Sequence, residues 1–427
     1  MIVEDITETG VDECDLHGSS SDHSEVHSND SSATLGTLPG EFVGRRWRVF
    51  WMAFKFGIYT ILTLGFYRFW MKTRLRRWYW SSVRFGGHPF EYVGDPLEKL
   101  LGFLIAVVIL AFYICVVNLA LMFASFSLFQ GDFPAYLLSF LGVVPLWLFA
   151  AYRARRYVLA RTRWRGIRFS LDPGAWGYVY RALWHWTLTL VSFGVLWPRK
   201  TFWLEKYKTD RTSFGSAPLE QHGCWRILFI PFLQVLIPAM CGVALIIWIG
   251  ETGHFQGVEI GLSCILLFWF GFGVVHYQVQ AKRRLTELKS IGEASLTINP
   301  SVTVVLRIYI LGYGLSGITA LIILVPISVI AFSTLDLVDV NLRLYPEISA
   351  VLSTWGLTVI GIASYFGLFL MWSALTHAFV TMPLWRHYAS VCELRDTQTF
   401  SVVTQLPRDA FQEAEGFAEA LDVGAGI

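Results

Sequence analysis

Five stretches of the chain contain no Asp, Glu, Lys or Arg and are long enough to cross a membrane as helices. They cover residues 100–126, 227–250, 260–279, 308–334 and 348–385. A helix needs about 20 apolar residues to cross a hydrocarbon core of about 30 Å. A buried helix of a water-soluble protein would normally keep a polar face over such a length. The pattern therefore predicts a polytopic integral membrane protein.

The positions of the Lys and Arg residues predict how these segments pair. Short loops rich in Lys and Arg stay on the cytoplasmic side of a membrane. Basic blocks occur at 153–169 and 281–292, and of the 34 Lys and Arg residues only Arg343 lies in a loop expected outside. We therefore expect three helical hairpins, with both chain termini in the cytoplasm. The hairpins are expected at 100–152, 225–280 and 308–380.

Two aromatic segments do not fit this alternation. Residues 50–70 and 178–197 carry positive charge at both ends, so a full crossing would place one charged end outside. Lys55 interrupts the first segment, and Arg181 and His185 interrupt the second. We expect both segments to be interfacial or re-entrant helices on the cytoplasmic side. The predicted fold class is an all-α transmembrane bundle with six clear spans plus these two helices, or with eight spans.

The chain also contains an internal similarity. The segments that begin at Gly65 and Gly194 match at an offset of 129 residues, which aligns Arg77 with Lys206. The match predicts a duplication within the membrane region. The expected units are residues 42–170, residues 171–300 and a shorter third unit at 301–400, between a disordered acidic cytoplasmic tail at 1–41 and a C-terminal cytoplasmic tail at 401–427.

The composition agrees with a membrane protein, and the sequence contains few residues that indicate catalysis or metal binding. Of the 427 residues, 54% are hydrophobic and only 15% are charged, against about 25% charged in a typical soluble domain. The six cysteines show no paired spacing, so we interpret them as reduced residues rather than disulfides or zinc ligands. No Walker loop, HExxH or GxSxG motif is present. We therefore predict no enzyme activity, no metal and no cofactor.

The basic blocks are the strongest functional candidates because they mix cations with aromatic side chains. Such a surface is expected to contact the anionic headgroups of the inner leaflet, where each basic residue contributes about 1 kcal/mol. The alternative is that the blocks only set the topology. The candidate headgroup-binding or anion-binding residues are Arg68, Lys72, Arg74, Arg76, Arg77, Trp70, Trp78, Arg155, Arg156 and Lys206.

Four basic side chains fall within or beside the predicted membrane segments. Ionisable groups inside a bilayer are costly and are often functional, although long basic side chains near helix ends also extend to the interface without a binding role. These candidates are Lys55, Arg181, His185 and Arg307.

Residues 62–96 carry a motif that resembles the YjgN-like family of bacterial inner-membrane proteins. The matching positions are Gly65, Tyr67, Trp70, Lys72, Arg74, Arg76, Arg77, Phe90, Tyr92 and Gly94. The second copy departs from the motif, because Leu196 replaces the tyrosine. The resemblance implies a multi-pass protein of the bacterial inner membrane built from repeats, and it implies no function.

Passive transport of a small solute, or a channel, is the leading functional prediction, because repeated hairpins often surround a pseudosymmetric path. The apolar runs contain no Asp or Glu, which argues against a coupled pump. The alternative is a protein that binds or translocates lipid headgroups, or a membrane scaffold or assembly partner. Anionic membrane lipids are the expected partners and nucleic acid is not; a homo-oligomer or an unknown membrane partner stays open.

Overall fold

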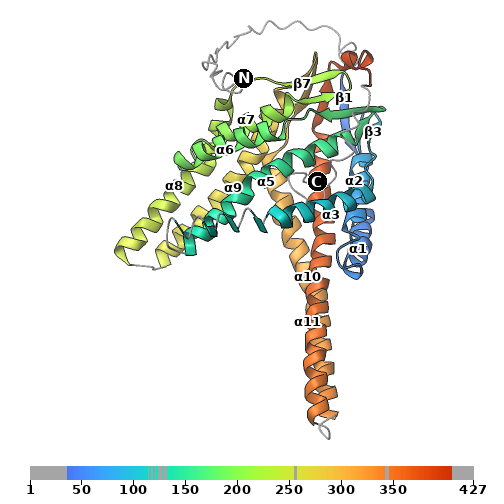
Figure 1. Ribbon diagram of the computed structural model, residues 1–427, viewed down its shortest axis with the longest axis vertical. Coiled ribbons are helices and arrows are strands. Elements are labelled where there is room, and N and C mark those ends of the chain that lie inside the picture. The colour runs from blue at the N-terminus through green and yellow to red at the C-terminus, as the bar shows by residue number, and fades with distance from the viewer. Residues whose placement is uncertain are drawn as a thin grey trace.

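The computed structural model describes residues 36–405, apart from 254–256, 342–345 and scattered positions between 114 and 131. Ten short strands form a closed antiparallel β-barrel at one end of the molecule, and helical hairpins extend away from it (Figure 1). The strands are β1 (Leu38–Phe42), β2 (Val83–Phe85), β3 (His88–Tyr92), β4 (Thr162–Trp164), β5 (Ile167–Leu171), β6 (Thr212–Phe214), β7 (Ala217–Gln221), β8 (Lys289–Ile291), β9 (Ala294–Ile298) and β10 (Cys392–Arg395).

The barrel is built from one local unit that recurs along the chain. A helix leads into a three-residue strand, a two-residue turn and a five-residue strand at β2–β3, β4–β5, β6–β7 and β8–β9. The turn between β2 and β3 is Gly86-Gly87, and both residues have positive φ, at 55° and 79°. Hairpin turns of this kind require positive φ at both central residues, which glycine adopts without steric cost.

The barrel closes through strands from opposite ends of the described chain. β1 pairs with β10 on one side, where Leu38 lies opposite Leu394, and with β2 on the other, where Phe42 lies opposite Val83. Every other strand pairs with its neighbours in sequence. Closure leaves no unpaired strand edge.

Aromatic side chains fill the barrel. Alternate residues of each strand point inward, and Phe85, Trp164 and Phe214 are buried there. Phe400, from a short 3₁₀ turn η5 (Thr397–Ser401), packs against Trp164 and Phe214 with ring centroids 5.6 and 5.7 Å apart. The barrel interior is therefore a hydrophobic core, with a cavity of about 190 Å³ among its aromatic side chains.

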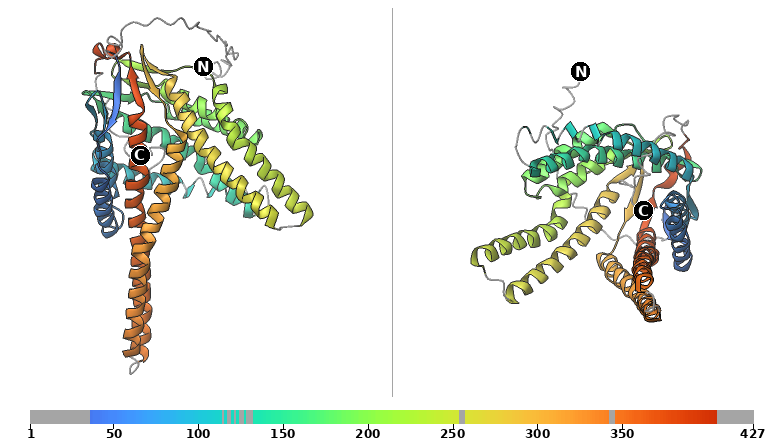
Figure 2. Two further views of the ribbon diagram at one scale, coloured as in Figure 1. Left: turned by 180° about the vertical axis from the view of Figure 1, so that it is seen from behind. Right: turned by 60° about the horizontal axis from the view of Figure 1, so that its bottom comes forward.

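The helices extend from the barrel in pairs. Figure 2 shows α8 and α9 diverging from α10 and α11, the pair that reaches farthest from the barrel. The helices are α1 (Arg46–Leu62), α2 (Arg68–Ser82), α3 (Pro96–Tyr113), α5 (Asp132–Ala160), α6 (Ala175–Val191), α7 (Trp197–Thr209), α8 (Phe229–Thr252) after the short turn η3 (Trp225–Leu228), α9 (Gly257–Glu287), α10 (Val302–Asn341), α11 (Pro346–Thr376) and α12 (Met382–Ser390) after the π-helical turn η4 (His377–Thr381).

Five helical segments are long and apolar enough to cross a membrane, in the part of the chain that the structure describes. The chain is therefore a membrane protein, as the hydrophobic pattern predicted. The first predicted hairpin, at 100–152, lies partly outside the described residues. The five segments are Pro96–Tyr113, Trp225–Thr252, Gly257–Glu287, Val302–Pro326 and Thr358–Ser390.

The prediction of an all-α bundle is wrong, because the chain contains the ten-stranded barrel. The missed strands are only three to five residues long and lie at the ends of the basic blocks. Arg84 and Arg163 occupy the central, outward positions of β2 and β4, with buried apolar or small side chains on either side. The alternation within three residues is too short to stand out from the neighbouring helical pattern.

The two aromatic segments form short helical hairpins. α1 turns back into α2, and α6 turns back into α7, through five-residue turns at 63–67 and 192–196. Because β1 precedes α1 and pairs with β2, which follows α2, both ends of the first hairpin meet at the barrel. The tips carry exposed apolar side chains, with Leu64 at 91% and Phe193 at 90% exposure. Both segments therefore turn back toward the barrel, and their placement as interfacial or re-entrant helices in the membrane stays a prediction.

The predicted unit boundaries at 170/171 and 300/301 stay predictions. The barrel takes strands from all three predicted units, so none of them forms a closed barrel by itself.

Replacement of Phe400 tests the barrel core. We expect Phe400→Ala to lower the free energy of unfolding by about 3 kcal/mol, because it leaves a cavity against Trp164 and Phe214. Urea denaturation in detergent micelles measures the change. Phe268→Ala removes a side chain that is 70% exposed on α9 and serves as the control. Equal effects of the two variants would contradict the packing role of Phe400.

Single-cysteine labelling tests the two hairpin tips. In a background whose native cysteines are replaced by serine, Phe66→Cys and Val191→Cys should not react with a membrane-impermeant maleimide added on the face opposite the barrel. Glu293→Cys, in the turn between β8 and β9, should react from the barrel face. Labelling of either tip from the opposite face would show that its helix crosses the membrane.

Candidate functional site

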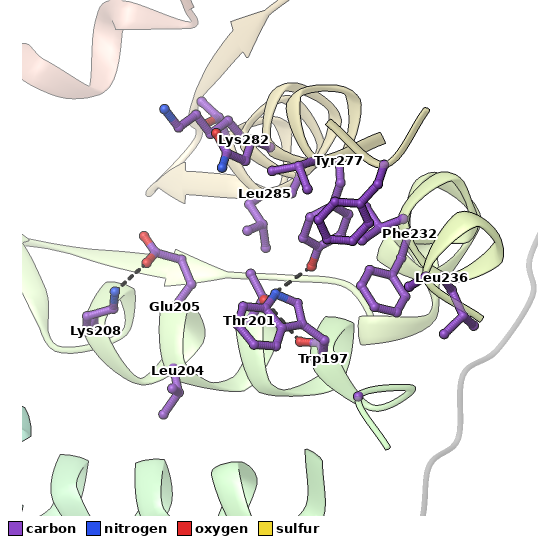
Figure 3. A pocket seen from close by; sticks show the side chains of 18 of the residues that line it. Trp197, Thr201, Leu204, Glu205, Lys208, Phe232, Leu236, Tyr277, Lys282 and Leu285 are labelled. Carbon is purple, nitrogen blue, oxygen red and sulfur yellow. Dashed lines mark hydrogen bonds and ion pairs between the residues drawn. The ribbon is translucent and has the colours of Figure 1, made fainter. Parts of the chain in front are cut away.

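A groove of about 800 Å³ lies between α7 and the hairpin of α8 and α9. Its walls are set by helical spacing, because residues three or four positions apart share one face of a helix. On α7 this face contains Trp197, Thr201, Leu204, Glu205 and Lys208. Figure 3 shows Thr201 and Glu205 on the side of α7 that faces residues of α8 and α9. The facing residues include Phe232, Val235, Leu236, Ala239, Phe270, Val274, Tyr277, Ala281, Lys282, Leu285 and Lys289.

One end of the groove is apolar. Phe232 of α8 packs edge-on against Tyr277 of α9, with ring centroids 5.3 Å apart. The Tyr277 hydroxyl donates a hydrogen bond to the Thr201 hydroxyl of α7 at 3.2 Å, which ties α9 to α7 (Figure 3). Leu236 and Phe270 extend this surface away from the barrel. Such a lining favours a hydrocarbon chain.

The other end of the groove is charged. The Glu205 carboxylate lies 2.8 Å from the Lys208 ammonium, 2.8 Å from the Lys289 ammonium and 3.5 Å from the Arg155 guanidinium. These residues come from α7, the first residue of β8, and α5. The fold thus gathers cations from three elements around one carboxylate; we call these four residues the Glu205 cluster.

The pKa shifts of this cluster agree with a surplus of cations. Burial favours the neutral carboxyl, but the cations around Glu205 outweigh it and hold its pKa well below the usual range. Burial lowers the pKa of Lys208, and its pairing with Glu205 does not restore it. The two pKa shifts have different leading causes, since nearby cations lower the pKa of Glu205 and burial lowers the pKa of Lys208. The side chains of Glu205 and Lys208 remain 19% and 21% exposed toward the groove.

Of the headgroup candidates from the sequence, Arg155 belongs to the Glu205 cluster. Lys206 lies on α7 next to Glu205, but its side chain turns away from the groove. Its ammonium donates a hydrogen bond to the backbone carbonyl of Gln221 at 2.6 Å and pairs with Asp210. Arg156 is buried in α5. The basic block at 153–169 therefore contributes one residue, Arg155, to this site.

The candidates on α2 divide between structural and exposed positions. Arg76 is buried, with its guanidinium 5.3 Å from the Tyr92 ring and 5.7 Å from the Trp80 ring. Trp78 is buried against Phe42. Arg68, Arg74 and Arg77 are exposed. The Arg74 guanidinium lies over the Phe56 ring, and Arg77 donates a hydrogen bond to the carbonyl of Gly94. Lys72 and Trp70 are half-buried.

The four intramembrane candidates do not meet in one site. Lys55 lies 5.9 Å from the Tyr59 ring on α1, and Arg307 is exposed on α10. On α6, Arg181 lies over the Tyr207 ring and His185 stacks on Trp203. None of the four lines the groove.

Sequence reasoning missed Glu205, Lys208, Lys282 and Lys289. The available signal was Glu205 itself, a lone acid between Lys200 and Lys206 in a basic helix. Among the described residues, no group of three or more His, Cys, Asp or Glu is placed to hold a metal ion.

The fold and the groove define a class of membrane protein whose helical hairpins are anchored on a small closed β-barrel. A family model described as a bacterial protein of unknown function, DUF898, matches residues 37–310, and the chain belongs to this family. This is the YjgN-like family that residues 62–96 resemble, so the family prediction is confirmed. The match includes β1 to β9 and the whole groove. No curated protein and no solved structure gives a significant match to the chain.

Removal of the carboxylate tests the Glu205 cluster. We expect Glu205→Gln to lower the free energy of unfolding at pH 7 by about 2 kcal/mol, because three partly buried cations lose their shared partner. The folded-state pKa of Glu205 is depressed, so its stabilisation is present above the ordinary value of 4.5 and is lost as pH falls through the folded pKa. The difference between wild type and variant should therefore shrink in acid.

Urea denaturation at pH 7 and at acid pH measures both effects. Glu287→Gln is the control, since the ion pair of Glu287 with Arg283 is exposed, and its effect should be under about 0.5 kcal/mol. A Glu205→Gln protein as stable as wild type at pH 7 would contradict the role of the carboxylate.

Proposed function

We propose that this protein binds a membrane lipid in the groove between α7 and the α8–α9 hairpin. The main observation in support is that one groove of about 800 Å³ has an apolar end and a cationic end. An apolar chain would lie along Phe232, Leu236 and Phe270, and a polar headgroup would lie near Lys208 and Lys289.

Physical chemistry supports this pairing of ligand and groove. Burial of apolar surface contributes about 25 cal/mol per Å², so a hydrocarbon chain gains from the apolar wall. Binding sites of this size commonly combine an apolar lining with a few placed polar groups. The charged end lies at Lys289, the first residue of β8, where α9 gives way to the barrel. The ligand would thus lie along the hairpin, with its headgroup toward the barrel.

This proposal selects the lipid-binding alternative among the functions that the sequence left open. A solute path between pseudosymmetric units would take its lining from more than one unit. The residues that line this groove come from 178–289, within the predicted second unit, and the Glu205 cluster adds Arg155 from the first. Solute transport, lipid translocation and a scaffold role stay predictions. We also propose that the barrel lies on the cytoplasmic side of the bacterial inner membrane, because the basic helix ends gather there.

A bulky side chain in the groove tests lipid binding. We expect Ala239→Trp, which places an indole in the groove, to reduce the amount of co-purified lipid retained per protein by about tenfold, because the chain-binding space is filled. Native mass spectrometry of the protein released from nanodiscs measures retained lipid.

The matched control is Ala244→Trp, the same substitution at an exposed position of α8. It should retain lipid like the wild type. Equal retention by Ala239→Trp and Ala244→Trp, with both proteins folded, would rule out the groove as the lipid site.

A further inference from the structure

The charged end of the groove carries more positive than negative charge. In the Glu205 cluster, the three cations Arg155, Lys208 and Lys289 share one carboxylate, which leaves two positive charges uncompensated. Lys282 also lines the groove, and its ammonium lies 5.1 Å from the Tyr388 ring. Figure 3 shows Glu205 rising from α7 toward the end of α9, where Lys282 lies.

A surplus of charge in a half-buried site is costly unless a counter-ion is present. Charges interact more strongly in a partly desolvated groove than in bulk water, and a buried cation without a partner destabilises the folded state. An anion that enters this end of the groove is therefore stabilised in proportion to the charge it brings.

We propose that the groove selects a lipid whose headgroup is a phosphomonoester over one whose headgroup is a phosphodiester. This inference rests on the proposed lipid binding and specifies the class of headgroup. A phosphomonoester carries a charge of about −1.5 to −2 near pH 7 and has three strong acceptor oxygens. It can neutralise both surplus charges of the Glu205 cluster and accept hydrogen bonds from several ammonium groups. A phosphodiester brings one negative charge and leaves one surplus charge of the cluster uncompensated.

Glu205 controls how much positive charge a headgroup meets in this arrangement. Its carboxylate holds Lys208 and Lys289 in place when the groove is empty. It also sets the size of the surplus, since one more cation would remain uncompensated without it. Loss of the carboxylate should therefore strengthen the binding of both classes of headgroup, because each then meets one more uncompensated cation.

The test compares two lipids with identical acyl chains. Full-length protein in phosphatidylcholine nanodiscs is titrated with phosphatidic acid, a phosphomonoester, or phosphatidylglycerol, a phosphodiester, and bound lipid is counted by native mass spectrometry. We expect phosphatidic acid to bind about tenfold more tightly at neutral pH. Its advantage should fall below about pH 6, where the phosphomonoester gains a proton. Inorganic phosphate serves as a competitor that lacks the chain and should displace the lipid weakly.

Two variants test which residues set the preference between the two headgroup classes. Lys289→Met should lower the affinity for phosphatidic acid to that for phosphatidylglycerol, and Glu205→Gln should raise the affinity for phosphatidylglycerol. Lys282→Met is a second probe of the same surplus if Lys289→Met does not fold. Glu287→Gln, on the exposed side of α9, should leave both affinities unchanged.

The outcomes separate this inference from the proposed function. If both lipids bind the wild type with equal affinity and both bind Ala239→Trp more weakly, the headgroup selectivity is overturned and lipid binding in the groove stands. If both lipids bind Ala239→Trp as tightly as they bind the wild type, both proposals are overturned. Displacement of phosphatidic acid by inorganic phosphate at equal concentration would show a free-phosphate site and overturn the inference. A loss of affinity for both lipids in Glu205→Gln would show that the carboxylate has only a structural role.

Discussion

The closure of the barrel by β1 is the contact on which the rest of the fold depends. β1 lies between β2 and β10, so it joins residues 38–42 to residues 392–395 at the other end of the described chain. Each helical hairpin begins and ends on a strand of this barrel. Without the closing pairs, β2 and β10 would become open edges, and the hairpins at both ends of the chain would lose their common anchor. Gly40 makes the closure sterically possible, because a Cβ there would overlap the carbonyl oxygens of Ala389 and Cys392.

This arrangement explains how hairpins that diverge can still position one site. The hydrogen bond between the hydroxyls of Tyr277 and Thr201 ties α9 to α7 in the groove. Their register is fixed where they enter the barrel, since α7 leads into β6 and α9 leads into β8. Lys289 is the first residue of β8, and its ammonium reaches Glu205 on α7. The barrel therefore determines which cations surround the carboxylate, although the groove itself lies between helices.

The hydrophobic pattern was sufficient to predict the membrane helices and insufficient to predict the barrel. A run such as 227–250 carries its signal over many consecutive residues, whereas β2 contributes only Val83, Arg84 and Phe85. The inward residues become a core only when strands from the whole chain meet, as Phe400 meets Trp164 and Phe214. The Glu205 cluster was missed for the same reason. Glu205 and Lys208 are three residues apart on α7, but no local spacing links them to Arg155 or Lys289.

The predicted offset of 129 residues compares α7 with α2. It aligns Arg76 with Glu205, Trp80 with Thr209, and Tyr92 with Gln221. The guanidinium of Arg76 is buried against the rings of Trp80 and Tyr92, so a cation is satisfied by aromatic faces. At the aligned positions beside the groove, smaller polar side chains stand in place of both rings, and a carboxylate stands in place of the cation. The Glu205 carboxylate is surrounded by cations from neighbouring elements, and the same local position therefore forms a charged site next to the apolar wall of the groove.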